Sequence, residues 1–156
     1  LNRGSLYDTF GDKKSLFLAT LAEYEKQGRR HMAEILQQPG SPRKAIEQWV
    51  KTEAQTCSGA AGLRGCLGMK AAMEMAPHDA DVAAWVKQIA RERDQLIAKA
   101  IKRGQAAGEI NPRLDAKVLA RYLGTALAGL KIMGIRGPSE REVNEVVSII
   151  LGVLVE

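Results

Sequence analysis

Aromatic residues, cysteines and long hydrophobic runs are all scarce in this sequence. Phe, Trp and Tyr make up 4% of the 156 residues, which is little for a β-sandwich, where aromatic and β-branched side chains are favoured. No apolar run is long enough to cross a bilayer and no signal peptide is visible, so we expect a cytoplasmic protein without a membrane partner. In that reducing compartment the two cysteines, Cys57 and Cys66, are expected to be free thiols.

The motifs of common catalytic and metal sites are also missing. The two histidines, His31 and His78, are far apart and in no metal-ligand spacing. The sequence has no phosphate-binding glycine loop, no nucleophile elbow and no Cys-x-x-Cys pair. We therefore predict no enzymatic activity, no metal and no cofactor.

The residues that are present favour one all-α domain, with at most a small appendage. Hydrophobic residues make up 46% of the chain and charged residues 26%, which is ample for a buried core in a protein of ordinary polarity. Apolar residues recur at helical spacing almost throughout, and no convincing strand pattern is found. The net charge of +5 is dispersed. It is compatible with nucleic acid as a partner, but equally with a merely basic surface.

Capping and breaking residues predict where the helices begin and end. Asp12, Asp79 and Ser41 are expected N-caps, and Ser139 with Glu142 forms a capping box. Residues 58–62, rich in Gly and Ala, are expected to form a flexible joint. Helices are predicted at about 3–9, 13–38, 42–57, 65–76, 80–104, 115–135 and 139–155.

The last two predicted helices have the pattern of an association surface. Small residues recur there at four-residue intervals, and apolar residues widen the surface around them. A helix that is apolar over so much of its circumference is buried on more than one side. This favours a four-helix interface in a homodimer, although burial inside a monomer core would explain the same pattern. The residues predicted for the interface are Ala120, Gly124, Ala128, Val143, Val147, Ile150, Leu151 and Leu154.

The first 17 residues carry the most specific pattern of the chain. It consists of small and polar residues followed by Leu6-Tyr7, Phe10, Gly11-Asp12, Lys13 and Leu16-Phe17. This segment resembles the recognition helix and the following helix of the TetR family of repressors, and the order of the later helices agrees. The resemblance implies that residues 1–14 are a remnant of a helix-turn-helix DNA-binding domain, and that residues 15–156 are a ligand-binding and dimerisation domain.

The first residues of the chain affect how well it is expected to bind DNA by itself. It starts with Leu1 rather than Met, and the first helices of a TetR-like head are absent, so we expect it to be a segment of a longer protein. A recognition helix without its partner helix has little to hold it in the groove. We therefore expect this segment to bind duplex DNA poorly by itself.

The resemblance implies DNA contacts for five side chains. In a helix-turn-helix the N-terminal residues of the second helix meet base edges, where the guanidinium of Arg3 would suit the O6 and N7 atoms of guanine. Lys13, at the N-terminus of the long helix, would suit a phosphate. Core packing ahead of an ordinary helix is the alternative interpretation. The predicted DNA-contacting residues are Arg3, Ser5, Tyr7, Thr9 and Lys13.

In the TetR family the helices after the DNA-reading head enclose a pocket, and a small molecule bound there releases the DNA. Glu53 is of interest because it interrupts an apolar stripe, where it would receive either a cationic ligand or an internal Lys or Arg. Each apolar candidate has core packing as its alternative role. The predicted pocket residues are Trp49, Glu53, Cys57, Cys66, Met69, Met73, Trp85, Tyr122 and Leu127.

Cys66 is in addition a candidate thiol sensor. It is predicted at the start of a helix, with Arg64 and Lys70 nearby in sequence, and this setting favours the thiolate and its reaction with electrophiles or peroxide. The segment Gly65-Cys66-Leu67 is also similar to the one used by thiol-sensing members of the TetR family. A buried and inert thiol is the opposite interpretation.

Together these patterns predict a homodimeric repressor with a palindromic operator, read by two recognition helices roughly 34–36 Å apart. A small-molecule effector, or modification of Cys66, would release it from DNA. A helical carrier or enzyme without a DNA role would explain the pocket residues but not residues 3–13. A purely structural dimerisation module would have no internal cavity.

Overall fold

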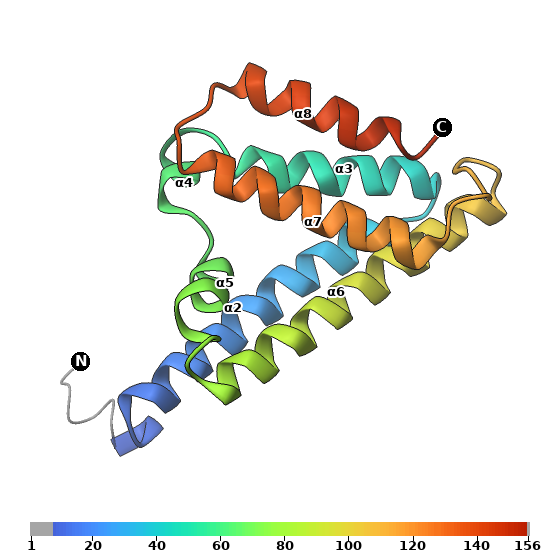
Figure 1. Cartoon of the computed structure of the whole chain (residues 1–156). Coiled ribbons are helices and arrows are strands. Elements are labelled where there is room, and N and C mark those ends of the chain that lie inside the picture. The colour runs from blue at the N-terminus through green and yellow to red at the C-terminus, as the bar shows by residue number, and fades with distance from the viewer. Residues whose placement is uncertain (1–7, 156) are drawn as a thin grey trace.

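The computed structural model of the chain describes residues 8–155, and over that range it contains helices and no strand (Figure 1). The prediction of an all-α fold is therefore confirmed. Of the helix predicted at 3–9, residues 8–10 are helical and the rest lies outside the described range. The other elements are α2 (Lys13–Leu36), α3 (Pro42–Gln55), α4 (Gly59–Arg64), α5 (Leu67–Lys70), the π-helix η1 (Ala71–Met75), α6 (Ala80–Ala106), α7 (Ala116–Gly134) and α8 (Glu140–Gly152).

The predicted caps fix the starts of four helices. The side chains of Asp12, Ser41 and Asp79 each accept a backbone N–H from the first turn of α2, α3 and α6, respectively. Ser139 and Glu142 form the predicted capping box at α8. Because the first amides of a helix have no partner within it, each such cap stabilises its helix by about 1 kcal/mol.

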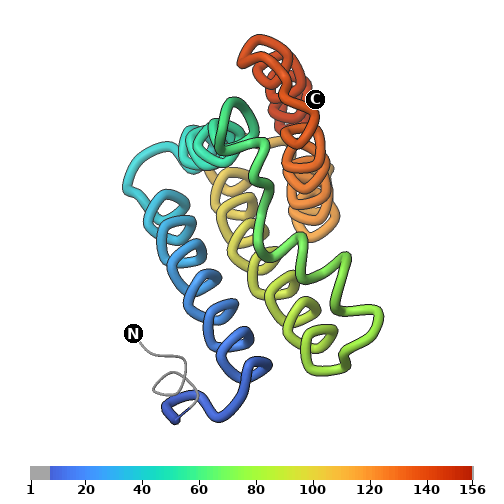
Figure 2. The backbone as a smooth tube through the Cα atoms, turned by 90° about the vertical axis from the view of Figure 1, so that its left-hand side faces the viewer, coloured from blue at the N-terminus to red at the C-terminus, as the bar shows by residue number. Residues whose placement is uncertain are grey.

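The two longest helices, α2 and α6, lie side by side and form the base of the molecule (Figures 1 and 2). α3 packs against both of them, and α7 packs along α6. α8 covers α3 and α7, so that α7 and α8 form the side of the molecule away from α2 (Figure 2). The short segment α5–η1 packs against α2 and α6 closer to the N-terminal end of α2.

The buried apolar residues form two clusters of unequal size. The smaller one joins Leu21 of α2, Ala71 of η1 and Val82 of α6. The larger one joins the end of α2 with α3, α6, α7 and α8. Its fully buried members include Leu36, Ile46, Ile101, Leu123 and Leu154.

Residues 58–62 do not form the predicted flexible joint. The segment continues into the helix α4, which packs on α7. A Cβ atom added at Gly62 or Gly134 would lie 2.6 or 2.8 Å from the carbonyl oxygen of Cys57. Glycine is thus needed at both Gly62 and Gly134, because the backbones approach each other so closely there that no side chain fits.

The helix predicted at 65–76 is also different in detail. α5 begins at Leu67 and passes directly into the π-helix η1, where the N–H of Ala76 donates to the carbonyl oxygen of Ala71, five residues back. Pro77, which has no N–H, follows immediately. Such π-turns are rare in proteins and are frequent at functional sites.

Most of the residues predicted for the dimer interface are buried within the single subunit. Ala120 of α7 is fully buried, and Gly124 faces α6, where a Cβ at Gly124 would lie 2.7 Å from the guanidinium of Arg93. On α8 the apolar stripe is turned toward α3 and α7, with Leu151 partly buried against the same core. Their role as contacts to a second copy stays a prediction. Those buried in the subunit core are Ala120, Val143, Val147, Ile150 and Leu154.

Candidate ligand-binding site

A cavity of about 440 Å³ lies between α2, α3, α5, η1, α6 and α7. Its wall on α2 runs from Tyr24 to Met32, between Leu21 of the smaller cluster and Ile35 of the larger one. Its size is within the range of pockets that hold small molecules. Six of the nine predicted pocket residues line it, namely Trp49, Glu53, Cys66, Met69, Trp85 and Leu127.

The other three predicted pocket residues lie elsewhere. Cys57 is 1% exposed in the core, and its Sγ donates to the carbonyl oxygen of Glu53 at 3.5 Å. Burial raises the pKa of the Cys57 thiol above its ordinary value. Met73 lies on η1 with 66% of its surface exposed, and Tyr122 is on the outer side of α7. Ala128, predicted for the dimer interface, does line the cavity.

Glu53 has an internal partner. The ammonium Nζ of Lys131 lies 2.8 Å from a carboxylate oxygen of Glu53 and donates a further hydrogen bond to the hydroxyl of Thr56 at 3.3 Å. Burial alone would lower the pKa of Lys131, but the charge and hydrogen bond of Glu53 outweigh it, and the net change is upward. Of the two partners that the sequence allowed for Glu53, the structure has the internal lysine.

Two acidic residues of the cavity wall, Glu25 and Glu92, were not predicted from the sequence, and Glu25 is the one without an ion pair. It lies on α2 and lines the cavity, yet it has no hydrogen bond and no ion pair to any residue in the range 8–155. Burial raises the pKa of its carboxyl group, against the opposing pull of Arg93 and Arg29. A signal was present, because Glu25 lies at i+4 from Leu21 on the same stripe as Met32, so that it interrupts an apolar face as Glu53 does.

Cys66 lies at the N-terminal end of α5 and is half-buried in the cavity wall. Its Sγ is 3.6 Å from the phenolic oxygen of Tyr24, within hydrogen-bond distance for sulfur. Burial and this contact raise the pKa of the Tyr24 hydroxyl. A Cβ atom at Gly68 would lie 3.9 Å from Sγ of Cys66 and 3.2 Å from a carboxyl oxygen of Glu25, so the thiol and this carboxyl group flank the same glycine.

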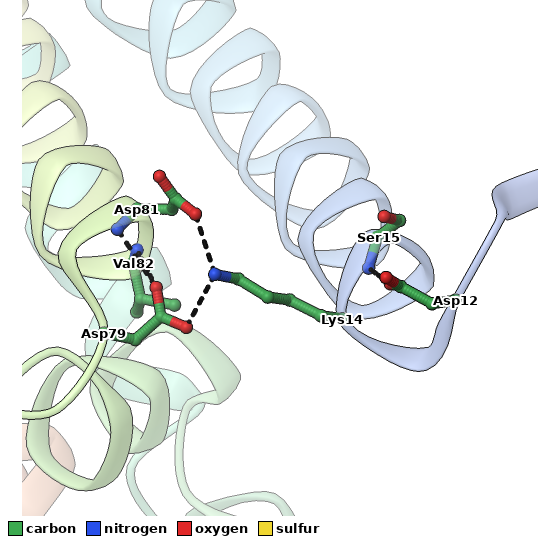
Figure 3. A network of polar contacts seen from close by, with 6 residues as sticks. All are labelled: Asp12, Lys14, Ser15, Asp79, Asp81 and Val82. Atoms are coloured by element: carbon green, nitrogen blue, oxygen red, sulfur yellow. Dashed lines mark hydrogen bonds and ion pairs between the residues drawn. The ribbon is translucent and has the colours of Figure 1, made fainter.

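The start of α2 is tied to the start of α6 by one lysine with two acidic partners (Figure 3). Nζ of Lys14 lies 3.0 Å from Asp79 and 2.7 Å from Asp81. These contacts raise the pKa of Lys14, and the hydrogen bond from Lys14 lowers that of Asp79. The two helices that form the longest walls of the cavity are therefore also linked at their N-terminal ends.

The residues predicted to contact DNA are only partly within the described range. Arg3, Ser5 and Tyr7 lie outside it. Thr9 and Lys13 are both exposed, at the end of the first helical segment and at the first residue of α2. The Asp12 carboxylate already accepts the N–H of Ser15 in the first turn of α2 at 2.7 Å, so this amide is not free for the phosphate contact that the sequence suggested for the helix end.

Residues 8–155 contain neither a metal-binding cluster nor a membrane-spanning helix. No group of three or more His, Cys, Asp and Glu side chains is arranged to hold a metal ion. No helix in that range combines the length and the apolar character needed to cross a membrane.

The chain is similar to transcriptional regulators in sequence. It is 30% identical over 122 residues to the uncharacterized HTH-type transcriptional regulator YezE of Bacillus subtilis, with 78% of this chain and 63% of that protein covered. It is 25% identical over 136 residues to the HTH-type transcriptional repressor ComR of Escherichia coli, with 86% and 65% covered. The chain thus spans somewhat less than two thirds of the length of these relatives.

The fold is similar to a solved regulator, and a family profile matches most of the chain. A cysteine mutant of the TetR family transcriptional regulator CifR, complexed with 26-bp double-strand operator DNA, superposes with a TM-score of 0.84 at 26% identity. That likeness covers 97% of this chain and 80% of the other. The profile described as "Tetracyclin repressor-like, C-terminal domain" matches residues 40–136. The chain belongs to the TetR family of transcriptional regulators.

Proposed function

We propose that this chain is the effector-sensing and dimerising part of a DNA-binding transcriptional repressor. An effector in the cavity, or modification of Cys66, would release the full-length protein from a palindromic operator. The relatives support the DNA-binding role, since ComR is named a repressor and CifR was solved on operator DNA. The division at about residue 14, with a DNA-binding remnant before it, stays a prediction, as do the DNA contacts of Arg3, Ser5, Tyr7, Thr9 and Lys13.

The observation that carries this proposal is the course of α2. The helix begins at Lys13, directly after the segment that resembles a recognition helix, and its residues Tyr24 to Met32 form one wall of the cavity. A ligand that displaces this wall displaces the start of the same rigid helix. Couplings of about 1–3 kcal/mol between sites are common in such systems and correspond to about 5–150-fold in DNA affinity.

The proposed dimer surface consists of the outward faces of α7 and α8. Val118, Tyr122 and Ile132 are exposed at helical spacing on α7, and Val146 and Ile149 are exposed on α8. These helices lie together on the side of the molecule away from α2 (Figure 2). Two such faces, related by a twofold axis, would bury their apolar area in a four-helix contact.

The DNA-binding role is tested with the full-length protein and duplex DNA from upstream of its own gene. We expect an affinity that falls steeply as the salt concentration rises, because phosphate contacts release counterions. Labelling Cys66 with N-ethylmaleimide in a Cys57→Ser background is expected to weaken this binding by at least about fivefold. The control is a Cys57→Ser/Cys66→Ser variant treated in the same way.

Two outcomes would contradict this proposal. A full-length protein without salt-dependent affinity for duplex DNA would be a carrier and not a repressor. Unchanged DNA affinity after labelling would exclude Cys66 as a release site. The dimer is tested separately by sedimentation: Ile149→Arg is expected to yield monomers, whereas Leu63→Arg, at another exposed apolar site, is expected to leave the dimer intact.

A further inference from the structure

The cavity is lined by six charged side chains, and five of them have a partner. Lys131 pairs with Glu53, and Arg29 pairs with Glu92. The guanidinium of Arg93 lies 3.2 Å from Asp94, its neighbour in sequence. Each of the three cations of the cavity wall is thus already paired with a carboxylate of the protein itself.

Glu25 is the charged residue left over. It faces the cavity without a hydrogen bond or ion pair to any described residue, and its carboxyl oxygens are not sealed off as those of a core residue would be. The six side chains are three cations and three carboxylates, and because Arg93 is paired with Asp94, which does not line the cavity, an ionised Glu25 is the lining charge left without an ion pair. A carboxylate in a half-buried site without a partner is costly, and a cation that enters the cavity removes that cost.

The apolar walls near Glu25 are suited to the same kind of ligand. A Cβ atom at Gly68 would lie 3.2 Å from a carboxyl oxygen of Glu25 and 3.8 Å from the indole ring of Trp85, so both groups lie within 4 Å of one point of the wall. Trp49 lines the cavity as well, and Met69 adds a side chain that adapts to different shapes. Indole faces attract organic cations through the ring quadrupole and take up aromatic or aliphatic bodies by stacking.

We propose that the cavity binds an amphiphilic organic monocation, a protonated amine or a quaternary ammonium with an apolar body, whose charge lies at Glu25 and whose body packs against Trp85 and Trp49. This inference names the class of effector for the proposed function and rests on that function only for its regulatory meaning. Binding itself is a property of the chain and is measured without DNA.

Tryptophan fluorescence gives a direct readout, because the chain has two tryptophans and both line the cavity. The protein is titrated with benzyltrimethylammonium, benzyl alcohol and phenylacetate, which share one aromatic body and differ in charge. We expect the cation to bind at least about tenfold more tightly than the neutral alcohol, and the anion to bind more weakly than either.

Glu25→Gln is the decisive variant, because it keeps the shape of the side chain and removes the charge. It is expected to reduce the preference for the cation over the alcohol by about tenfold while leaving the affinity for the alcohol unchanged. Glu34→Gln is the matched control, since Glu34 is an exposed carboxylate on the same helix that does not line the cavity, and it is expected to change nothing. Unchanged affinity for the alcohol also shows that the variant folds.

The outcomes separate this inference from the proposed function. Equal or tighter binding of phenylacetate, or a cation preference that survives Glu25→Gln, would overturn the inference even if the full-length protein is a repressor. Cation binding that depends on Glu25 supports it. If the bound cation then leaves the DNA affinity of the full-length protein unchanged, regulation through the cavity fails while the cation site stands.

Discussion

The ammonium group of Lys131 lies 2.8 Å from a carboxylate oxygen of Glu53. Glu53 is therefore paired within the protein, and Glu25 is the carboxylate that can accept a cationic ligand. Removing one partner leaves the other charge half-buried and alone. We therefore expect Glu53→Gln to improve the binding of phenylacetate by about tenfold and to weaken that of benzyltrimethylammonium. Adding Lys131→Met to Glu53→Gln should restore the original order of the two ligands. A double-mutant cycle in which the two changes simply add would show that the pair is not coupled.

The two cysteines are expected to differ in their reaction with iodoacetamide. Cys66 is half-buried in the cavity wall, whereas Cys57 is buried in the core with a raised thiol pKa. Since the thiolate is the nucleophile, we expect Cys66 to be alkylated at least about tenfold faster than Cys57 in the folded protein at neutral pH. Mass spectrometry of the labelled peptides measures both rates, and in denaturant the difference should vanish. Equal rates in the folded state would mean that the core around Cys57 opens readily.

The bridge of Lys14 to Asp79 and Asp81 is expected to hold the first turns of α2 and α6 together. Exposed ion pairs add little to global stability, so Lys14→Met should leave the melting temperature nearly unchanged. It should accelerate hydrogen exchange of the first amides of α2 and α6 severalfold. Lys13→Met is the control, because that neighbouring lysine has no ion pair to a described residue.

The same bridge has a defined pH dependence. The pKa of Asp79 is lowered by its hydrogen bond from Lys14, so its stabilising effect is present above the ordinary pKa of aspartate and is lost as the pH falls through the lowered value. Lys14, whose pKa is raised, stays charged throughout the acidic range. The difference in exchange rates between wild type and Lys14→Met should therefore shrink as the pH falls through the lowered pKa of Asp79. A difference that does not shrink would show that the pairing of Lys14 with Asp79 contributes nothing to the exchange rates.

Local signals were sufficient to predict most helix boundaries. Each N-cap bonds an amide only two or three residues further along the chain, so both partners are visible in one short stretch of sequence. This holds for Asp12, Ser41, Asp79 and Ser139. Trp49 and Trp85 were also found, because apolar stripes show which face of a helix is buried. The segment 58–62 was predicted wrongly, since the small residues that make a joint flexible are the same ones that permit close packing.

Partners far apart in the sequence could not be predicted. The pairing of Glu53 with Lys131 and of Lys14 with Asp79 requires helices whose relative positions no local pattern contains. The small residues that recur at four-residue intervals on α7 illustrate the same limit. They let another helix approach closely, and the sequence does not show whether that helix belongs to the same subunit or to a second copy. In the structure, Gly124 faces Arg93 of the same chain.

Gly134 is expected to be intolerant of any side chain. A Cβ atom there would lie 2.8 Å from the carbonyl oxygen of Cys57, and backbone atoms cannot move aside as a flexible side chain does. We expect Gly134→Ala to destabilise the protein by about 1–3 kcal/mol in urea unfolding. Gly28→Ala, in an open part of α2, is expected to be stabilising by up to about 1 kcal/mol, because alanine favours helix more than glycine. If both variants behave alike, the close approach of Gly134 to the backbone of Cys57 does not matter for stability.

Glu25 is expected to lower the stability of the protein at neutral pH, because its half-buried carboxylate has no ion pair in the absence of a ligand. Burial raises the pKa of its carboxyl group in the folded state. Between the ordinary pKa of glutamate, about 4.3, and the raised value, the folded protein binds more protons than the unfolded one, so stability falls as the pH rises. Glu25→Gln lacks this titration. It should therefore unfold at a higher temperature than wild type at pH 7, and the difference should shrink as the pH is lowered toward about 4. Thermal unfolding at fixed protein concentration measures this, and a difference that is constant with pH would show that the carboxyl group is not held in a desolvated site.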